Sequence, residues 1–249
     1  MIRRLAAPLA LAAGLAAAQA GAQDCAEIAF DGQRYTVCEV DAASADLRLF
    51  LRGPDGRVLG QFGAIDAMLA EDGARLAFAM NAGMYHADRA PVGLYIENGT
   101  EIAPLVASAG PGNFGLLPNG IFCIRETRAD VIETLAFVAD PPACTFATQS
   151  GPMLMIDGEL HPRFLVDSDS RHVRNGVGTS ADGSRAIFAI SRGPVTFHEF
   201  GRLFRDGLKL PNALYLDGSV SRLYAPALGR HDPGFALGPV VGVVVPKAP

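Results

Sequence analysis

The sequence predicts an α+β fold with a mostly antiparallel or mixed β-sheet core, few helices and a single domain. Short β-prone runs between glycine-containing turns fill most of the chain, and only two stretches space their apolar residues as a helix does. The runs are mostly apolar on both faces, which indicates a covered sheet. The turns expected at hairpin tips are Asp31-Gly32, Asp55-Gly56, Asn98-Gly99, Asp157-Gly158 and Asp182-Gly183.

The predicted elements follow in chain order. After a first hairpin, strands are expected at residues 47–51, 76–80, 92–97, 120–124, 152–156, 186–191, 213–216 and 240–245. Helices are expected at residues 64–71 and 196–208, where apolar residues recur at three- and four-residue steps. Val195 and Thr196 make a suitable start for the second helix.

The N-terminal segment, residues 1–22, is predicted to be a secretory signal peptide. It has a charged pair, Arg3 and Arg4, then an apolar run shorter than a membrane-spanning helix needs, then small residues up to Ala22. We expect cleavage after Ala20 or Ala22, a mature domain of residues 23–249, a periplasmic or secreted location, and no stable membrane insertion after cleavage.

The four cysteines fit an oxidising compartment. In a two-residue hairpin around Asp31-Gly32, Cys25 falls opposite Cys38 on a non-hydrogen-bonded pair, where α-carbons approach to about 4.5 Å, so this pair is predicted to be bridged. Cys123 and Cys144 are either a second bridge or two buried thiols, because their spacing does not decide between them.

The overall charge argues against one class of partner. A net charge of -5 with scattered basic residues leaves no basic stripe of the kind that binds nucleic acid. An anionic ligand would therefore need a local arginine cluster.

Five segments at the ends of predicted strands carry more polar residues than a structural strand needs. They are residues 80–86, 118–120, 148–152, 170–176 and 215–222. Loops held by a rigid sheet are where sites are usually assembled, although Asn-Gly and Asp-Gly pairs also serve as plain turns.

At these segments the chain resembles the phosphodiester glycosidases, the family that includes the uncovering enzyme, and within it an uncharacterised exported branch. The resemblance runs from about Asp24 to near the C-terminus. Its matching parts are Asn81-Ala82-Gly83-Met84, Asn119-Gly120, Ser150-Gly151-Pro152, Arg171 with Arg174-Asn175-Gly176-Val177-Gly178, the helix after Thr196, and Leu216-Asp217-Gly218. In the best-known members a glycine-rich turn follows the aspartate, whereas Ser219 and Val220 stand there in this chain.

Two residues are candidates for catalysis. Asp217 follows a run that reads as a buried strand, where a carboxylate must be paired or hydrogen-bonded; the alternative is a plain turn residue. His86 ends a glycine-containing turn and could exchange a proton near neutral pH; the alternative is a surface histidine.

The candidates for binding substrate centre on two arginines. Arg171 and Arg174 beside Asn175 could hold phosphate, because a guanidinium is a planar fork matched to that group; the alternative is that both face solvent or pair with Asp167 and Asp169. The residues expected to orient hydroxyls or phosphate oxygens are Asn81, Asn119, Gln149, Ser150 and Ser219. No cofactor and no metal site is predicted, since Asp167-Ser168-Asp169-Ser170 lacks the rest of a calcium loop's pattern.

Together with the resemblance, these residues predict an exported hydrolase that cleaves a sugar-phosphodiester or related glycosidic bond in a carbohydrate or sugar-phosphate substrate. The oxocarbenium-like transition state of such a reaction is stabilised by a carboxylate at the sugar and positive charge at the departing phosphate. The alternative is a non-catalytic envelope protein that binds an anionic glycan or partner with the same arginines. The sequence does not determine the oligomeric state.

Overall fold

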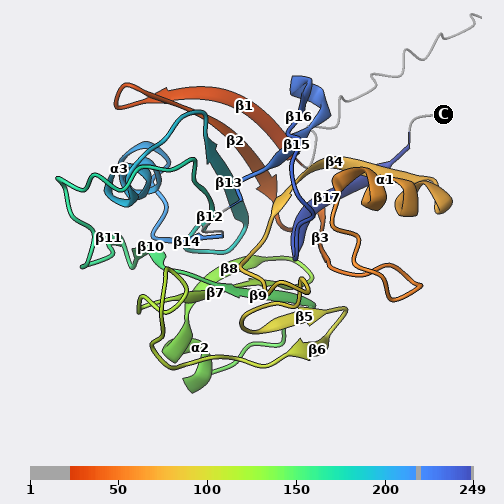
Figure 1. Cartoon of the computed structure of the whole chain (residues 1–249), viewed down its shortest axis with the longest axis horizontal. Helices are drawn as coiled ribbons and strands as arrows, with labels where there is room; N and C mark the ends of the chain where they lie inside the picture. The colour runs from red at the N-terminus through yellow and green to blue at the C-terminus, as the bar shows by residue number, and fades with distance from the viewer. Residues whose placement is uncertain (1–22, 217–219, 248–249) are drawn as a thin grey trace, which may run out of the picture.

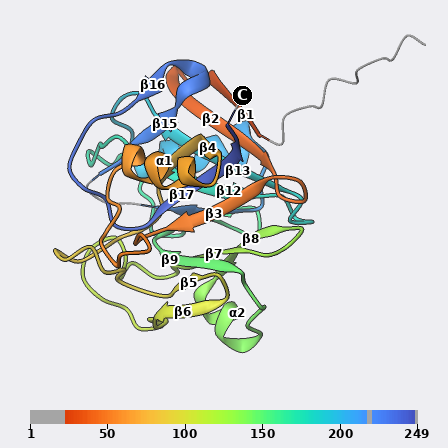
Figure 2. The ribbon, with the colours of Figure 1, turned by 90° about the vertical axis from the view of Figure 1, so that its right-hand side faces the viewer.

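Three antiparallel β-sheets, each with a helix on its outer face, make up the protein (Figure 1, Figure 2). The computed structural model describes residues 23–216 and 220–247, so the predicted signal segment lies outside the described residues. The sheets share one core, which confirms the predicted α+β class, the mostly antiparallel core with few helices, and the single domain. Every helix in the described part of the chain is too short or too polar to span a bilayer.

The first sheet has seven strands and carries α3 on its outer face. In spatial order they are β1 (Gln23–Phe30), β2 (Gln33–Asp41), β13 (Arg185–Ser191), β12 (Asn175–Thr179), β14 (Asn212–Tyr215), β10 (Met153–Ile156) and β11 (Glu159–Leu160). A capping box of Thr196 and Glu199 starts α3 (Phe197–Arg202), which continues as a π-helical turn, η1 (Leu203–Gly207). The predicted helix at 196–208 is therefore confirmed, with a wider last turn.

The second sheet is covered by α1 (Phe62–Glu71), which buries Phe62, Ile65 and Leu69 against it. Figure 2 shows α1 in front of β4 and β17. The strands in spatial order are β16 (Arg230–His231), β15 (Leu223–Ala225), β4 (Ala74–Asn81), β17 (Val240–Pro246) and β3 (Asp46–Phe50). A short 3-10 helix, η2 (Pro226–Leu228), joins β15 to β16.

The third sheet lies at the bottom of both views and is covered by α2 (Thr134–Ala139). Its strands are β6 (Thr100–Ala103), β5 (Tyr95–Glu97), β9 (Phe146–Ser150), β7 (Gly120–Ile124) and β8 (Ala129–Glu133). Only the last half of the strand expected at 92–97 forms, because the N–H of Val92 bonds the Met84 carbonyl and that of Leu94 bonds the Gln149 side chain in place of a neighbouring strand.

One phenylalanine from each sheet meets at the centre of the shared core. The ring of Phe188 in β13 lies 5.1 Å from that of Phe78 in β4 and 5.6 Å from that of Phe122 in β7. All three side chains are fully buried. Each sheet thus has an inner face in this core and an outer face under its own helix, which accounts for strands that are apolar on both faces.

The turn predictions hold at all five positions. Asp31-Gly32, Asn98-Gly99 and Asp157-Gly158 have positive φ at both residues, as a type I′ hairpin turn requires, and they join β1 to β2, β5 to β6, and β10 to β11. At Asp55-Gly56 and Asp182-Gly183 only the glycine has positive φ.

Both cysteine pairs form disulfides. Cys25 lies opposite Cys38 in the β1–β2 register with a Cα–Cα distance of 4.0 Å, which confirms the hairpin prediction. Cys123 and Cys144 are also bridged, with a Cα–Cα distance of 5.5 Å. The alternative of two buried thiols is therefore wrong.

Replacing Cys25 and Cys38 together by alanine should lower the free energy of unfolding by about 3 kcal/mol, because the bridge restricts the unfolded chain over a short loop. Urea unfolding of the parent and the double variant under oxidising conditions measures the difference. Adding reductant should remove most of it. Equal midpoints under oxidising conditions would show that this bridge contributes nothing to stability.

Candidate active site

Four of the polar segments singled out in the sequence close into a ring of hydrogen bonds around the start of β12. The closing bonds are Asn81 Nδ2 to Asn175 Oδ1 (3.1 Å), Thr148 Oγ1 to the Ala82 carbonyl (2.8 Å), Tyr215 N to the Pro152 carbonyl (3.1 Å) and Leu216 N to the Asn175 carbonyl (3.2 Å). The fifth segment joins through Pro118, whose carbonyl accepts a bond from Met153 N at 3.0 Å. Residues 94 positions apart in the chain therefore meet at one place.

Two asparagines, both fully buried, join the first and second sheets within this ring. Asn175 Nδ2 donates to the Asn81 carbonyl at 3.1 Å, which reciprocates the bond from Asn81 Nδ2. Arg222 N donates to Asn81 Oδ1 at 2.9 Å, and Ser221 Oγ lies 3.2 Å from Asn175 Oδ1. The two amides are held in one orientation by these bonds.

Ser150, at the end of β9, has a fully buried hydroxyl with no hydrogen-bond partner among the described residues. The segment opposite approaches closely through Gly83: a Cβ there would lie 2.9 Å from Thr148 Oγ1 and 4.0 Å from the Ser150 Cβ, and its φ is +154°. Leaving a buried hydroxyl unpaired costs about 1–3 kcal/mol. The Ser150 hydroxyl is thus a group that a ligand or water would satisfy.

Gln149 uses its whole hydrogen-bonding capacity within the protein. Its Oε1 accepts from Leu94 N and Val106 N, both at 3.0 Å, and its Nε2 donates to the Val106 carbonyl (2.7 Å) and to Thr134 Oγ1 (3.2 Å). The side chain therefore fastens the loop around Val106 to the third sheet.

Asn119 belongs to the same hydrogen-bond network as Gln149 and supports the ring through that network. Its Nδ2 donates to the Phe114 carbonyl at 2.8 Å, and its Oδ1 accepts from Thr134 Oγ1 at 2.6 Å. Sequence reasoning missed Thr134, which opens α2 and lies outside the polar segments, because no motif marks it.

Arg174 is 1% exposed and lies on the opposite face of β12 from Asn175, because alternate residues of a strand point to opposite sides. Its Nε donates to the Val195 carbonyl (2.9 Å), its Nη2 donates to the Ser170 carbonyl (3.0 Å), and its Cζ stacks 3.6 Å from the centre of the Phe197 ring. Burial lowers the pKa of this guanidinium. Among the described residues, no carboxylate pairs with it.

Arg171 is exposed on the same side as Arg174 and is held by α3. Its Nη2 donates to both carboxylate oxygens of Glu199, at 3.0 and 2.8 Å. Glu199 also closes the capping box of the helix. The partner of Arg171 is therefore this helix residue and not Asp167 or Asp169.

The remaining candidates are not part of the ring. His86 is exposed in a turn, where its backbone N–H bonds the Ala90 carbonyl at 2.8 Å and its carbonyl accepts from Arg89 N. Asp217 and Ser219 lie outside the described residues. No group of three histidine, cysteine, aspartate or glutamate side chains that could hold a metal is found within residues 23–216 and 220–247.

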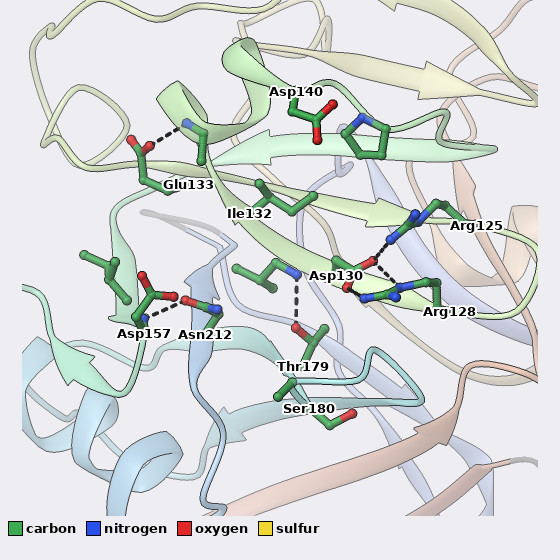
Figure 3. A pocket seen from close by; sticks show the side chains of 15 residues that line it. Arg125, Arg128, Asp130, Ile132, Glu133, Asp140, Asp157, Thr179, Ser180 and Asn212 are labelled. Atoms are coloured by element: carbon green, nitrogen blue, oxygen red, sulfur yellow. Dashed lines mark hydrogen bonds and ion pairs between the residues drawn. The ribbon is translucent and has the colours of Figure 1, made fainter.

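A separate pocket of about 410 Å³ lies at the far ends of the strands that form the ring (Figure 3). β10, β12 and β14 reach it with Ile156, Thr179 and Asn212. In Figure 3, Asp130 bonds both Arg125 and Arg128, while Glu133, Asp140 and Asp157 add further carboxylates to the lining, so this pocket has an excess of acidic groups. The ring and this pocket are therefore separated by the length of a strand.

Comparisons with known proteins identify relatives over most of the chain. A family model described as phosphodiester glycosidase matches residues 74–243. The Escherichia coli (strain K12) protein called Uncharacterized protein YigE is 34% identical over 205 residues, which is 82% of this chain and 78% of that protein.

Two solved structures share the fold. The catalytic domain of zebrafish N-acetylglucosamine-1-phosphodiester alpha-N-acetylglucosaminidase, auto-inhibited by its pro-peptide, matches with a TM-score of 0.63 and 14% identity, covering 91% of this chain and 85% of that chain. A putative exported protein from Burkholderia pseudomallei matches with a TM-score of 0.55 and 12% identity, covering 85% of this chain and 74% of that chain.

Gln149→Glu should lower the free energy of unfolding by at least about 2 kcal/mol at pH 7, because it places a carboxylate oxygen against the Val106 carbonyl. Burial raises the pKa of the introduced carboxyl, so the folded state binds a proton more tightly than the unfolded state and the loss is smaller at pH 5. Chemical unfolding at both pH values measures this.

Asn98→Asp is the matched control, since it makes the same amide-to-acid change in an exposed hairpin turn. It should change the unfolding free energy by less than about 0.5 kcal/mol. A Gln149→Glu protein as stable as this control would contradict the structural role of Gln149.

Proposed function

The chain belongs to the phosphodiester glycosidase family of hydrolases, and we propose that it cleaves the bond between an anomeric sugar carbon and a phosphodiester outside the cytoplasm. We take residues 23–249 as the mature domain. The two disulfides are consistent with an oxidising compartment.

The observation that carries this proposal is the buried guanidinium of Arg174 beside the ring. It is removed from water, its hydrogen bonds in the described part of the chain go to carbonyl groups and to the side chain of Tyr215, and burial lowers its pKa. A buried cation that is paired with no carboxylate of the described residues is costly, and a bound phosphate would supply negative charge together with acceptors matched to a planar fork. Arg171, already held by Glu199, is proposed as a second and weaker phosphate contact.

The proposed chemistry needs one carboxylate at the sugar. The positive charge that develops on the sugar ring in the transition state is stabilised by Asp217, which follows the buried end of β14 in the sequence. The phosphate monoester that departs is a stabilised anion whose last proton has a pKa near 6, so it needs a weaker general acid than an alcohol does. His86 is proposed as the group that exchanges that proton.

The ring supplies orientation in this scheme. The unpaired hydroxyl of Ser150 would orient a hydroxyl or phosphate oxygen of the substrate, and Ser219 is proposed to assist it. Asn81 and Asn175, whose buried amides bond each other, are proposed to hold the surrounding ring in place. Gln149 and Asn119 act through the loop and helix that they fasten.

Asp217→Asn should reduce kcat for hydrolysis of the methyl phosphodiester of N-acetylglucosamine 1-phosphate by about a hundredfold or more, because it removes the charge that stabilises the transition state. Release of N-acetylglucosamine measures turnover. Asp157→Asn, the same change in the exposed β10–β11 turn, should leave kcat unchanged. Saturable binding by the parent without any turnover would identify a non-catalytic binding protein instead.

Arg174→Lys should raise KM for this substrate by about tenfold, since lysine keeps the charge but loses the planar fork and the stacking on Phe197. Arg171→Lys should have a smaller effect in the same direction. Arg185→Lys, at an exposed pair with Glu39, is the control. Thermal unfolding checks that each variant is folded, and a folded Arg174→Lys protein with the parental KM would refute the phosphate role.

A further inference from the structure

Phe235 is the most exposed large apolar side chain of the described residues, at 83%. It lies in the loop between β16 and β17. A single exposed apolar side chain is common on protein surfaces, so the significance of Phe235 depends on how it is held and on what lies beside it.

The loop that carries Phe235 is firmly anchored. The carbonyl of Phe235 itself accepts a bond from Arg222 Nη1 at 2.7 Å, and Gln61 Nε2 donates to the Gly234 carbonyl at 3.2 Å. Leu237 N, two residues further on, bonds the Gly60 carbonyl at 2.7 Å, and the Leu237 side chain is fully buried. The side chain of Phe235 is thus exposed although the backbone of its loop is held in place. Its exposure therefore does not result from a loosely held loop.

Arg222 connects this loop to the ring of hydrogen bonds. Its side chain is 4% exposed, its Nε and Nη2 both donate to the Asp232 carbonyl (3.1 and 2.9 Å), and its Cζ lies 5.1 Å from the centre of the Phe62 ring. Its backbone N–H bonds Asn81 Oδ1. Arg222 therefore fixes the position of Phe235 relative to the ring of hydrogen bonds.

A cleft of about 550 Å³ lies between Phe235 and the ring. The other residues that line the cleft include His172, Val173, Val220 and Pro233. Ser221 lines it as well and lies within hydrogen-bonding distance of Asn175 Oδ1, so the cleft opens directly beside the asparagine pair. The volume is in the usual range for small-molecule sites.

The lining favours an uncharged ligand that is apolar on one face and polar at its edge. Among the described residues that line the cleft there is no carboxylate, and the one cation, Arg222, is committed to the loop and to Gln61. The apolar surface comes from Phe235, Val173 and Val220, while His172 and Ser221 offer hydrogen-bonding groups. A pyranose has this distribution, with axial C–H groups on one face and hydroxyls around its edge.

We propose that this cleft binds a pyranose ring of the substrate, with the ring of Phe235 as its stacking surface and Ser221 as a hydrogen-bonding group next to the asparagine pair. The choice of a sugar as occupant rests on the proposed function. The cleft is a site distinct from Arg174, which lies on the other face of β12.

Saturation-transfer NMR with methyl α-N-acetylglucosaminide, which carries no phosphate, tests the cleft independently of hydrolysis. The parent and Phe235→Tyr should transfer saturation to the C–H protons of one sugar face. Phe235→Ala should weaken binding about tenfold or more, as expected when one stacking aromatic is removed. Leu135→Ala, which removes an exposed apolar side chain on α2, is the matched control and should bind as the parent does.

Further measurements separate this inference from the proposed function. Sugar binding that depends on Phe235 in a protein without phosphodiester turnover would uphold the cleft and refute the function. Turnover of the methyl phosphodiester with a KM that Phe235→Ala leaves unchanged would refute the cleft and uphold the function. Decyl phosphate binding that requires Phe235, with no binding of the glucosaminide, would also overturn the proposal in favour of an alkyl-chain site.

Discussion

The packing of Phe188 against Phe78 and Phe122 is the contact on which the rest of the structure depends, because it holds one strand of each sheet in a single core. With the inner faces used there and the outer faces partly covered by α1, α2 and α3, the central strands are buried on both faces. Most of the buried polar residues gather where these strands end. The ring around β12 is such a place, and the pocket at Thr179 is its counterpart one strand length away.

Arg174 and Arg222 are both buried cations, but they differ in the partners that hold them. Arg174 and Arg222 each stack on a phenylalanine and donate to carbonyl groups, and burial lowers the pKa of both. Arg222 also donates to the side chain of Gln61 and fixes a loop, so its role is complete within the protein. Arg174 donates to two carbonyls, at 2.9 and 3.0 Å, and is hydrogen-bonded to the side chain of Tyr215, so its partners among the described residues are uncharged at neutral pH.

Local patterns predicted what local physics determines. The aspartate-glycine and asparagine-glycine turns adopt positive φ because few other residues tolerate it, and the register that follows places Cys25 opposite Cys38. The capping residues around Thr196 likewise mark where α3 begins. Each of these features depends on residues close together in the chain.

The parts that could not be predicted depend on contacts between distant residues. The division into three sheets follows from the meeting of phenylalanines far apart in sequence. Thr134 and Arg222 carry no motif, and their importance comes only from what the fold places beside them. That Gln149 uses all of its hydrogen-bonding groups within the protein is known only once its partners in the fold are known. The same holds for the opposite orientation of Arg174 and Asn175.

The orientation at the start of β12 constrains how a substrate can lie. Arg174 points toward α3 and Asn175 toward β4, so a phosphodiester that reaches both must pass over the end of the strand. In the binding mode that we propose, the phosphate would lie toward the buried guanidinium, and the sugar would lie toward the asparagine pair and the cleft of Ser221 and Phe235. The scissile bond between them would then fall at the boundary of the two faces. In the proposed scheme the carboxylate would act at this boundary, and Asp217 is proposed for that role because it directly follows the buried Leu216, whose N–H bonds the Asn175 carbonyl.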